Sequence, residues 1–332
     1  MVLGRKWVLK KHFNGLPKRE DFELVEEEIP FLLPRQFIFH SRYISVDPYQ
    51  RPYSAMMTPP LTMIGSSVAT IEESRPPDFP VGAHVIIYAG WVERGVASGD
   101  EKGVFEPLRL VPNLKNIGLS HFLGACGATG NTAYFGFLKI CQPKAGETVV
   151  VSGAAGAVGS LVGQIAKIKG CKVIGYAGTN EKCEWLRNIG FDFAFNYKTC
   201  KIEDTLKTAA PEGVHCYFDN VGGKISAAVI AVMNTRGRVS VCGSISHYND
   251  VGGSAKSIDI LPFCVFKELR VEGFLVTRWN SRWTEGITAM AAWITNGDIK
   301  VQETVVDGFE STPDAFIGLF SGKNTGKMVV KI

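Results

Sequence analysis

Three glycines, Gly153, Gly156 and Gly159, stand at the spacing of a phosphate-binding turn. A β-branched run at 148–152 precedes them and a helix-like stretch at 157–169 follows. Glycines at such a turn let backbone N–H groups approach a pyrophosphate, whose charge the N-terminus of the helix stabilises. The pattern therefore predicts a dinucleotide site, and the alternative is a tight turn that binds nothing.

The end of the next strand indicates which nicotinamide cofactor the site prefers. A protein that binds NAD places Asp or Glu there, about twenty residues beyond the first glycine, to hold the ribose hydroxyls. Residues 176–180 contain no acid, and Glu181 is followed at once by Lys182. A missing carboxylate removes repulsion of a 2'-phosphate and an ammonium adds attraction, so NADP(H) is predicted. The alternative for Lys182 is a solvated residue in the first turn of a helix.

The elements that must position this turn belong to a predicted Rossmann domain. After Ile117, apolar strands alternate with amphipathic helical stretches, which is typical of βαβ units and a parallel sheet. The predicted strands are 148–152, 171–177, 191–195, 214–220, 238–243 and 269–276, and the predicted helices include 157–169, 181–189 and 224–233. This pattern predicts an α/β fold with a six-stranded, doubly wound sheet.

The rest of the chain is predicted to be mainly β. Up to about residue 115, short β-type runs alternate with proline and glycine, at 7–10, 37–46, 68–73, 84–90 and 105–111. From about Gly297 the chain returns to short β runs, at 301–306 and 328–332. We expect this last part to fold back onto the first domain.

Composition argues against several classes of function. The 332 residues carry a formal net charge of only +4 without a basic block, so nucleic acid is not an expected partner. The N-terminus lacks the continuous apolar segment of a signal peptide, and the charge-free stretch 148–166 is rich in glycine, so neither secretion nor a membrane span is expected. The eight cysteines form no CxxC pair and are interpreted as reduced thiols of a cytoplasmic protein.

A metal site is not predicted. The sequence has no closely spaced cysteine quartet, no cysteine before Cys126, and no ligand pattern around its first four histidines. Because the sequence predicts no metal that could act as a Lewis acid, it does not favour oxidation of an alcohol. Hydride addition to an electron-poor C=C bond needs only a positioned cofactor and a hydrogen-bond donor for the developing enolate.

Motifs spread over the whole chain resemble those of one known family. They lie at 46–51, 133–136, 153–160, 196–198, 218–223, 242–246 and 324–327, in order and at matching spacing from residue 3 to residue 331. On these motifs the chain is identified as a member of the prostaglandin reductase 1 family, also called leukotriene B4 12-hydroxydehydrogenases, among the zinc-independent medium-chain dehydrogenases/reductases.

The resemblance implies a domain organisation, an assembly and an activity. It implies a GroES-like, mainly β catalytic domain at 1–122 and 297–332 around an NADP-binding Rossmann domain at 123–296. It also implies a homodimer that reduces the C=C bond of α,β-unsaturated ketones and aldehydes with NADPH. Two alternatives stay open: a quinone oxidoreductase of the same superfamily, and a non-catalytic NADPH-binding protein like some lens crystallins.

The resemblance also implies the site residues. The catalytic positions are Tyr248, as hydrogen-bond donor to the enolate oxygen, and Tyr49. The alternative for Tyr248 is an aromatic residue of a surface loop, and the alternative for Tyr49 is a packed turn residue. The cofactor positions are Gly156, Ala157, Val158 and Gly159 for the pyrophosphate, Lys182 and Tyr197 for the 2'-phosphate, Asn220 for the ribose and pyrophosphate region, and Thr132, Cys242, Gly243, Ser244, Ile245, Ser246, His247, Tyr248, Phe274, Leu275, Val276 and Asn324 for the nicotinamide half.

Five positions depart from the family's pattern. Ala128 and Thr129 stand where the family has Met-Pro, Ser66 and Ser67 stand in place of paired glutamines, and Thr277 stands in place of a tyrosine. These positions lie near the expected substrate and nicotinamide region. The resemblance implies an enzyme of the 15-oxo-prostaglandin 13-reductase or 2-alkenal reductase type, and these departures leave the particular eicosanoid substrate open.

Overall fold

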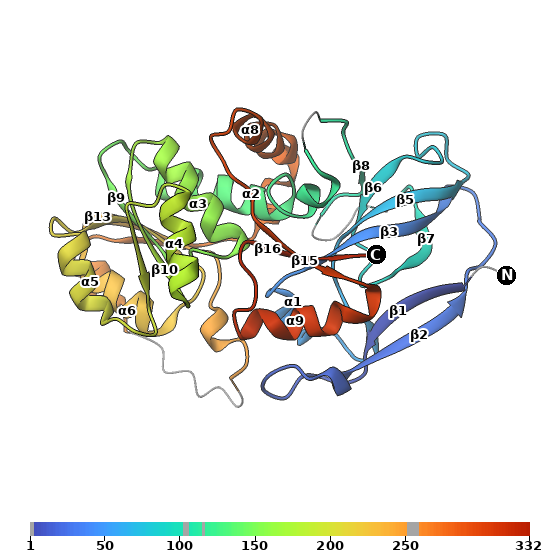
Figure 1. Ribbon diagram of the computed structural model, residues 1–332, viewed down its shortest axis with the longest axis horizontal. Coiled ribbons are helices and arrows are strands. Elements are labelled where there is room, and N and C mark those ends of the chain that lie inside the picture. The colour runs from blue at the N-terminus through green and yellow to red at the C-terminus, as the bar shows by residue number, and fades with distance from the viewer. Residues whose placement is uncertain (1–2, 102–105, 115–116, 251–258) are drawn as a thin grey trace. The chain divides into compact units, whose positions relative to one another are not determined.

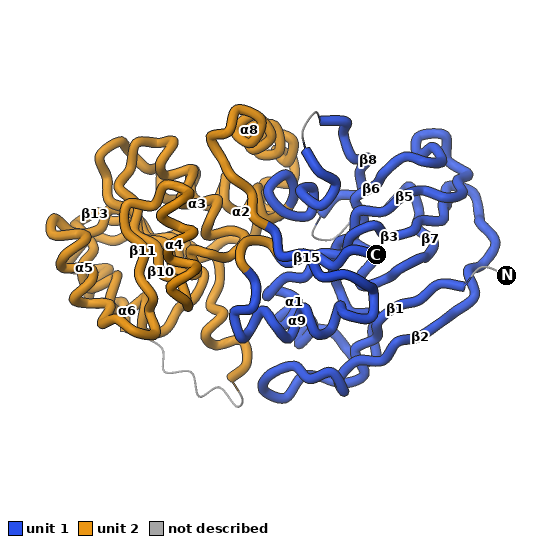
Figure 2. Tube along the Cα trace, in the orientation of Figure 1, with its two compact units in different colours: residues 1–127, 303–324, 328–332 blue, residues 128–302, 325–327 orange. Residues whose placement is uncertain are grey.

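The computed structural model describes residues 3–101, 106–114, 117–250 and 259–332, in two compact units (Figure 2). Unit 1 comprises Met1–Gly127, Glu303–Asn324 and Met328–Ile332, and unit 2 comprises Ala128–Gln302 and Thr325–Lys327. The C-terminal part of the chain therefore contributes to both units.

Unit 2 is built on a six-stranded sheet in which every neighbouring pair of strands is parallel (Figure 1). In spatial order the strands are β11 (Phe193–Asn196), β10 (Lys172–Ala177), β9 (Thr148–Val151), β12 (Val214–Asp219), β13 (Met233–Val241) and β14 (Arg270–Gly273). Counted along the chain, this is the order 3-2-1-4-5-6 of a Rossmann fold, which confirms the predicted fold class. The order reverses between β9 and β12, the position where such folds bind ligands at the carboxyl ends of the strands.

Helices connect the strands of this sheet. Those of unit 2 include α2 (Ala128–Phe135), α3 (Ala157–Ile168), α4 (Asn180–Asn188), α5 (Ile202–Ala209), α6 (Gly223–Ala231), α7 (Leu261–Phe266) and α8 (Trp283–Thr295). Helix α3 packs against β9 and β10, α4 packs against β10 and β11, and α6 packs against β12. All four side chains of β9 are buried, as a central parallel strand requires.

Several elements of unit 2 differ from the predicted ones. Strand β13 begins at Met233, five residues before the predicted strand at 238–243, because Met233 pairs with Val214 although exposed residues interrupt the apolar pattern. Strand β14 ends at Gly273, before a 3-10 turn replaces the predicted end of that strand. The three named helices correspond to α3, α4 and α6, and the prediction named none of α2, α5, α7 and α8.

Unit 1 contains two sheets. A three-stranded sheet has the order β2-β1-β4, and a seven-stranded sheet has the order β15-β16-β3-β5-β6-β8 with β7 also paired to β3. The bounds are β1 (Leu3–Leu9), β2 (Phe22–Glu28), β3 (Gln36–Val46), β4 (Leu61–Thr62), β5 (Ser67–Ser74), β6 (His84–Ile87), β7 (Arg94–Ser98), β8 (Arg109–Leu110), β15 (Glu303–Asp307) and β16 (Lys327–Lys331). The mainly β character of this part therefore agrees with the sequence pattern.

The predicted β runs of unit 1 overlap seven of these strands. They correspond to β1, β3, β5, β6, β8, β15 and β16, except that Phe105 of the run at 105–111 lies outside the described residues. Strand β2 was not predicted, since its second half consists of three exposed glutamates. Strands β4 and β7 were not predicted either.

An aromatic cluster joins the two ends of the chain within unit 1. Phe316 on α9 (Thr312–Phe320) meets Trp91 edge-on, with ring centroids 5.6 Å apart, and Phe22 stacks on Trp91 at 5.4 Å. All three side chains are buried. This packing fixes the returning segment within unit 1. Among the helices of the described residues, none has the length and apolarity needed to cross a membrane.

Candidate functional site

The glycine-rich turn lies between the carboxyl end of β9 and the start of α3. Gly153 has a φ of +56°, which L side chains rarely adopt, and Gly156 is the N-cap residue of α3. A Cβ on Gly159 would lie 2.4 Å from the carbonyl oxygen of Gly153, so only glycine fits there. These glycines let the strand enter the helix with the backbone exposed at the turn.

The first turn of α3 fits an anionic group. It contains no acidic residue, and its first intrahelical bond runs from the N–H of Ser160 to the carbonyl of Gly156, at 3.1 Å. The N–H groups of Ala157, Val158 and Gly159 therefore have no acceptor within the helix. Together with the positive end of the helix dipole, they form a cradle that suits a pyrophosphate.

The returning C-terminal segment pairs with this turn inside unit 2. The N–H of Gly326 donates to the carbonyl of Ala155 at 2.8 Å, and Gly326 forms a parallel bridge with Gly156. A Cβ on Gly326 would lie 1.9 Å from the carbonyl oxygen of Gln302, so glycine is needed here too. Asn324 precedes Gly326 by two residues and ends its segment of unit 1.

Two lysines gather beyond the carboxyl end of β10. Lys182 lies in the first turn of α4, and its N–H donates to Oγ1 of the N-cap residue Thr179 at 3.3 Å. A Cβ on Gly178 would lie 3.2 Å from the hydroxyl of Tyr197 and 3.6 Å from Cε of Lys198, so the glycine leaves room for both. Burial, and then the positive charge of Lys198, lower the pKa of Lys182. An anion between these lysines would stabilise both charges, so the arrangement fits a 2'-phosphate.

Two further residues lie with Lys182 and Tyr197 at the corner beyond the carboxyl end of β10. Lys198 was not predicted, and its only signal in the sequence is its place directly after Tyr197. Glu181 is exposed, and hydrogen bonds from the backbone and from Thr179 at the start of α4 lower its pKa. The glutamate therefore acts as a residue of the helix N-terminus.

The turn after β12 is tied to the end of β9. Asn220 donates through Nδ2 to the carbonyl of Ser152 at 2.7 Å, and its N–H donates to Oγ of Ser152 at 2.9 Å. Asp219 is buried and accepts a hydrogen bond from the same Ser152 hydroxyl at 2.8 Å. Neither Ser152 nor Asp219 was predicted, although a polar residue ending each of two apolar strands was a visible signal.

The predicted nicotinamide segment at 242–248 lies along that turn. The N–H of Ile245 donates to the carbonyl of Asn220 at 3.3 Å, and the N–H of Ser246 donates to the carbonyl of Val221 at 3.1 Å. Burial, and then the negative charge of Asp219, raise the pKa of Cys242 to about 12, so this thiol stays protonated at neutral pH.

Tyr248 folds back onto its own segment. Its hydroxyl accepts a hydrogen bond from the N–H of Ser244 at 3.3 Å, and a Cβ on Gly243 would lie 2.7 Å from the same oxygen. The side chain is half-buried. A phenol can accept and donate at once, so the contact with Ser244 does not use the phenol proton.

The predicted residues from α2 and from the segment after β14 make packing contacts. Thr132 donates through Oγ1 to the carbonyl of Ala128 at 2.8 Å, within its own helix. The ring of Phe274 lies 5.5 Å from that of Trp279, and a Cβ on Gly136 would lie 2.2 Å from the Phe274 ring. Leu275, in contrast, is 57% exposed.

Tyr49 belongs to unit 1, where it precedes α1 (Gln50–Ser54). The fully buried Gln50 holds this turn, because its Nε2 donates to the carbonyl of Ile64 at 2.6 Å and its Oε1 accepts from the N–H of Asp47 at 3.0 Å. A Cβ on Gly65 would lie 2.6 Å from Nε2 of Gln50, so the close contact requires a glycine. Tyr49 therefore projects from a rigid turn.

Two further tyrosines surround Tyr49. The ring of Tyr53 meets it edge-on at 5.5 Å, and Tyr88 forms a hydrogen bond with it. Burial, followed by the neighbouring Tyr88 and Asp47, raises the pKa of Tyr49 well above its ordinary value. Neither Tyr53 nor Tyr88 was predicted; Tyr88 directly follows β6, and its place at a strand end was the only signal.

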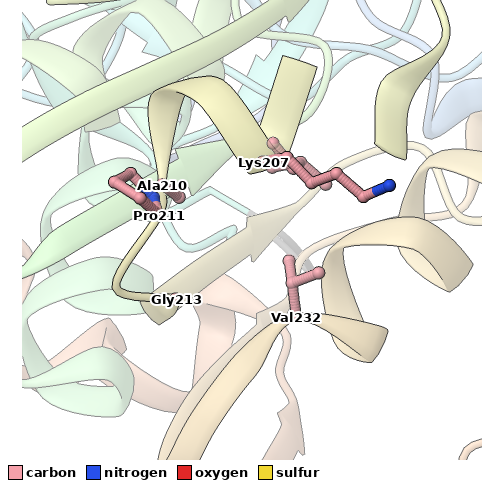
Figure 3. Close-up of a pocket in the computed structure, with 6 residues that line it drawn as sticks. Lys207, Ala210, Pro211, Gly213 and Val232 are labelled. Carbon is pink, nitrogen blue, oxygen red and sulfur yellow. The ribbon is translucent and has the colours of Figure 1, made fainter. Parts of the chain in front are cut away.

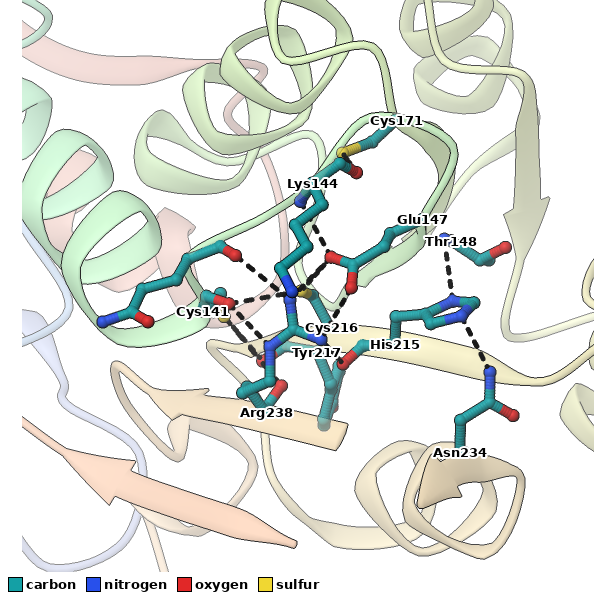
Figure 4. Close-up of polar contacts among 11 residues, drawn as sticks. Cys141, Lys144, Glu147, Thr148, Cys171, His215, Cys216, Tyr217, Asn234 and Arg238 are labelled. Carbon is teal, nitrogen blue, oxygen red and sulfur yellow. Dashed lines mark hydrogen bonds and ion pairs between the residues drawn. The ribbon is translucent and has the colours of Figure 1, made fainter. Parts of the chain in front are cut away.

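A second polar cluster lies at the amino ends of the parallel strands of unit 2 (Figure 4). Arg238 donates to both carboxylate oxygens of Glu147, at 2.9 and 2.6 Å, and through Nε to the carbonyl of Cys141 at 2.8 Å. His215 accepts the N–H of Thr148 through Nδ1 at 3.1 Å. These residues hold the ends of β9, β12 and β13 together.

A cavity of about 330 Å³ lies near this amino end of unit 2, beside α5 (Figure 3). It is lined by Leu206, Lys207, Ala210, Pro211, Gly213 and Val232, none of which is a predicted site residue. Among the described residues, no three His, Cys, Asp or Glu side chains form a group that could hold a metal ion.

Comparison with known proteins decides the family. A model described as zinc-binding dehydrogenase matches residues 157–292, and one described as the N-terminal domain of oxidoreductase matches residues 5–105. Prostaglandin reductase 1 of Oryctolagus cuniculus is 45% identical over 336 residues, which cover 98% of this chain and 93% of that protein. The chain belongs to the prostaglandin reductase 1 family.

The two family models place this family member among the medium-chain dehydrogenases/reductases, and further relatives match over nearly the whole chain. The NADPH-dependent curcumin reductase of Escherichia coli K12 is 36% identical over 341 residues, which cover 99% of this chain and 97% of that protein. The crystal structure of CurA from Vibrio vulnificus in complex with NADPH superposes with a TM-score of 0.90 at 36% identity and covers 98% of each chain.

Within the prostaglandin reductase 1 family, the five departing positions of this chain lie in both units. Ser66 and Ser67 are buried at the start of β5, and the N–H of Ser45 donates to the carbonyl of Ser66 at 2.9 Å. Ala128 and Thr129 begin α2, and Thr277 lies in the 3-10 turn after β14.

Proposed function

We propose that this family member is an NADPH-dependent reductase of the C=C bond of α,β-unsaturated ketones and aldehydes. The proposal of NADPH as cofactor rests on the N–H cradle at the start of α3 together with Lys182 and Lys198 beyond β10. A Rossmann fold provides such a cradle for the pyrophosphate of any dinucleotide, and the two lysines suit the 2'-phosphate that distinguishes NADPH from NADH. The names of its relatives, which include reductases of prostaglandins, curcumin and 2-alkenals, support the substrate class.

NADPH supplies a hydride, which the reaction adds to the β-carbon of the conjugated carbonyl. The carbonyl oxygen gains negative charge as an enolate, and protonation at the α-carbon gives the saturated product, so one NADPH and one proton are consumed. Tyr248 donates a hydrogen bond to the enolate oxygen and so lowers the barrier. Tyr49 contacts the substrate and positions its carbonyl group.

The remaining predicted residues hold the cofactor. Gly156, Ala157, Val158 and Gly159 bind the pyrophosphate, Lys182 and Tyr197 bind the 2'-phosphate, and Asn220 binds the ribose and pyrophosphate region. Thr132, 242–248, Phe274, Leu275, Val276 and Asn324 surround the nicotinamide half. Lys198 joins Lys182 in this proposal, because the two lysines interact in the structure.

The domains and the location of the protein follow from the same proposal. Residues 1–122 and 297–332 form the catalytic domain, and residues 123–296 form the NADP-binding domain. The protein acts in the cytoplasm on small conjugated carbonyl compounds, and neither nucleic acid nor a membrane is a partner.

The protein forms a homodimer through the edge of the unit 2 sheet. Strand β14 is the last strand of that sheet, and the neighbouring α7 has no buried residue, with Val265 70% and Phe266 84% exposed. An apolar helix beside an open strand edge suits a second copy of the same chain. Light scattering after gel filtration checks this: the wild type elutes as a dimer, and Phe266→Asp elutes as a monomer.

A substrate panel tests the proposed function. Enones, enals, 1,4-quinones and 15-oxo-prostaglandins are assayed separately with NADPH and with NADH. We expect turnover of enones and enals with NADPH. Activity on quinones far above that on enals favours the quinone oxidoreductase alternative, and no turnover of any enone favours the non-catalytic alternative.

A variant of Tyr248 tests the donor. Tyr248→Phe removes the hydroxyl and is expected to lower kcat/KM for the best enone roughly 10- to 100-fold, with the Kd for NADPH unchanged. Tyr43→Phe, a change outside the proposed site, serves as the matched control. Full activity of Tyr248→Phe would remove this tyrosine from the mechanism.

A further inference from the structure

Asp219 is a buried carboxylate at the carboxyl end of β12, surrounded by hydrogen-bond donors. Its Oδ1 accepts from the hydroxyls of Ser152 and Tyr217, each at 2.8 Å, and from the N–H groups of Val221 and Gly222, each at 2.9 Å. Its Oδ2 accepts from the hydroxyl of Ser226 at 2.5 Å. Hydrogen-bond donors therefore face both carboxylate oxygens.

Asp219 joins three segments of the proposed cofactor site. Its side chain holds Ser152 at the end of β9 and the turn that follows Asn220. Its backbone carbonyl accepts the N–H groups of Cys242 at 2.8 Å and Gly243 at 3.1 Å, at the end of β13. Movement of this one residue would therefore shift the ends of all three strands.

Within the part of the chain that the structure describes, the hydrogen-bond partners of Asp219 are all neutral. Among the described residues, no lysine, arginine or histidine forms an ion pair with it; its partners are neutral hydroxyls and the N–H groups at the start of α6. Neutral donors delocalise a charge but do not cancel it, so a negative potential persists around the residue. That potential raises the pKa of Cys242, where burial is the larger cause, and the pKa of Tyr217, again after burial.

The two redox states of the cofactor differ in the charge of the nicotinamide ring, which is neutral in NADPH and positive in NADP+. We propose that Asp219 is a positioning residue whose uncompensated buried charge favours the positive nicotinamide ring, and so lowers the free energy of NADP+ relative to NADPH on this protein. This inference rests on the proposed function, because residues 242–248 carry the potential to the nicotinamide only if that segment binds it. The charge would also stabilise the positive charge that develops on the ring during hydride transfer.

The variant Asp219→Asn removes the charge and keeps the shape. The amide oxygen can accept the N–H groups of Val221 and Gly222, and the amide nitrogen can donate to the hydroxyl of Ser226. Ser226→Ala is the matched variant, because it removes one donor to the carboxylate and leaves the charge in place.

The experiment measures the Kd values of NADP+, NADPH and 2'-phospho-ADP-ribose, which lacks the nicotinamide ring, by titration calorimetry without substrate. Asp219→Asn is expected to raise the ratio of the NADP+ Kd to the NADPH Kd roughly 3- to 10-fold, which is the size of a charge effect at an effective protein dielectric near 20. Its affinity for 2'-phospho-ADP-ribose should change by less than about twofold, because this fragment has no ring to sense the charge. Ser226→Ala should leave the ratio of the two Kd values as in the wild type.

The other outcomes overturn the inference. Equal weakening of all three ligands by Asp219→Asn would make the residue purely structural, and three unchanged Kd values would remove it from the site. If Asp219→Asn fails to fold, Ser226→Ala still decides: a shifted ratio with the charge retained contradicts the proposal, and an unshifted ratio supports it. A wild-type protein that binds neither NADP+ nor NADPH would instead contradict the proposed function, and the inference with it.

Discussion

The two edges of the parallel sheet of unit 2 use polar residues in opposite ways. At the amino edge, Arg238 and Glu147 face one another with side chains only 16% and 14% exposed, and the guanidinium also donates to backbone carbonyls. At the carboxyl edge lie the N–H groups in the first turn of α3, the neighbouring Lys182 and Lys198, and the buried Asp219, whose hydrogen-bond partners within the described residues are neutral. The first arrangement is complete as it stands, and the second is suited to a ligand that brings negative and positive charge.

This difference separates stability from function within one sheet. A buried pair that is already matched gives a ligand nothing to bind, and its loss leaves an uncompensated charge in the fold. A cradle of backbone N–H groups has little effect on the stability of the fold, and it binds an anion when one is present. Changes at the amino edge should therefore alter stability with little effect on cofactor binding, whereas changes at the carboxyl edge should alter cofactor binding directly.

The largest expected effect is at the glycine turn. In Gly159→Val, the new Cβ would meet the carbonyl oxygen of Gly153 at 2.4 Å and displace the start of α3. We expect the affinity for NADPH to fall by more than about 100-fold, since the anion cradle is lost. Gly118→Ala, where the nearest atoms lie 4.0 Å away, is the control and should bind normally. Unimpaired binding by Gly159→Val would place the cofactor elsewhere.

Much of this carboxyl edge could be predicted from the sequence, for a physical reason. The spacing of Gly153, Gly156 and Gly159 is local, and the strand before it and the helix after it follow from side-chain periodicity. The contacts of Asp219 with Ser152 and with the end of β13 join residues far apart in the chain, so no local pattern reveals them. The partnership of Tyr49 with Tyr88 is hidden in the same way.

At the amino edge, the expected effect is on stability. Glu147→Ala leaves the half-buried guanidinium of Arg238 without its carboxylate and should lower the free energy of unfolding by about 3 kcal/mol. The Kd for NADPH should stay within about twofold of the wild type. Lys167→Ala breaks an exposed pair with Asp192, with both side chains 35% exposed, and should cost less than about 1 kcal/mol. Denaturant unfolding measures the free energy of unfolding, and calorimetric titration measures the Kd for NADPH. A loss of NADPH affinity in Glu147→Ala as large in free energy as its loss of stability would contradict the difference between the two edges.

At the corner beyond β10, the expected effect is on cofactor choice. Lys182→Ala should lower the preference for NADPH over NADH, as a ratio of kcat/KM values, roughly 10- to 100-fold, because a charge-assisted contact with the 2'-phosphate is lost. Lys198→Ala should also lower the preference for NADPH over NADH, by a smaller factor. Lys207→Ala, at the cavity beside α5, is the control. An unchanged preference in both Lys182→Ala and Lys198→Ala would contradict the assignment of this corner.

The smallest expected effect is a pH dependence of stability at the amino edge. Burial acts to raise the pKa of Glu147, but the hydrogen bonds and charge of Arg238 outweigh it, so the pKa is lowered in the folded state. A lowered pKa gives stability that is present above the unfolded value of about 4.3 and is lost as the pH falls through the folded value. The stability difference between wild type and Glu147→Gln should therefore be constant from about pH 8 to 5 and shrink below about pH 4. A difference that grew on acidification would have the wrong sign.

The transfer of deuterium from the cofactor tests whether this protein reduces the C=C bond of a conjugated carbonyl with the hydride of NADPH. The wild-type protein is incubated with a simple enone and with NADPH deuterated at either face of the nicotinamide C4, and the product is analysed by NMR. We expect that one of the two cofactors delivers its deuterium to the β-carbon and yields the saturated ketone. Deuterium at the carbinol carbon of an allylic alcohol, or no oxidation of NADPH, would contradict it.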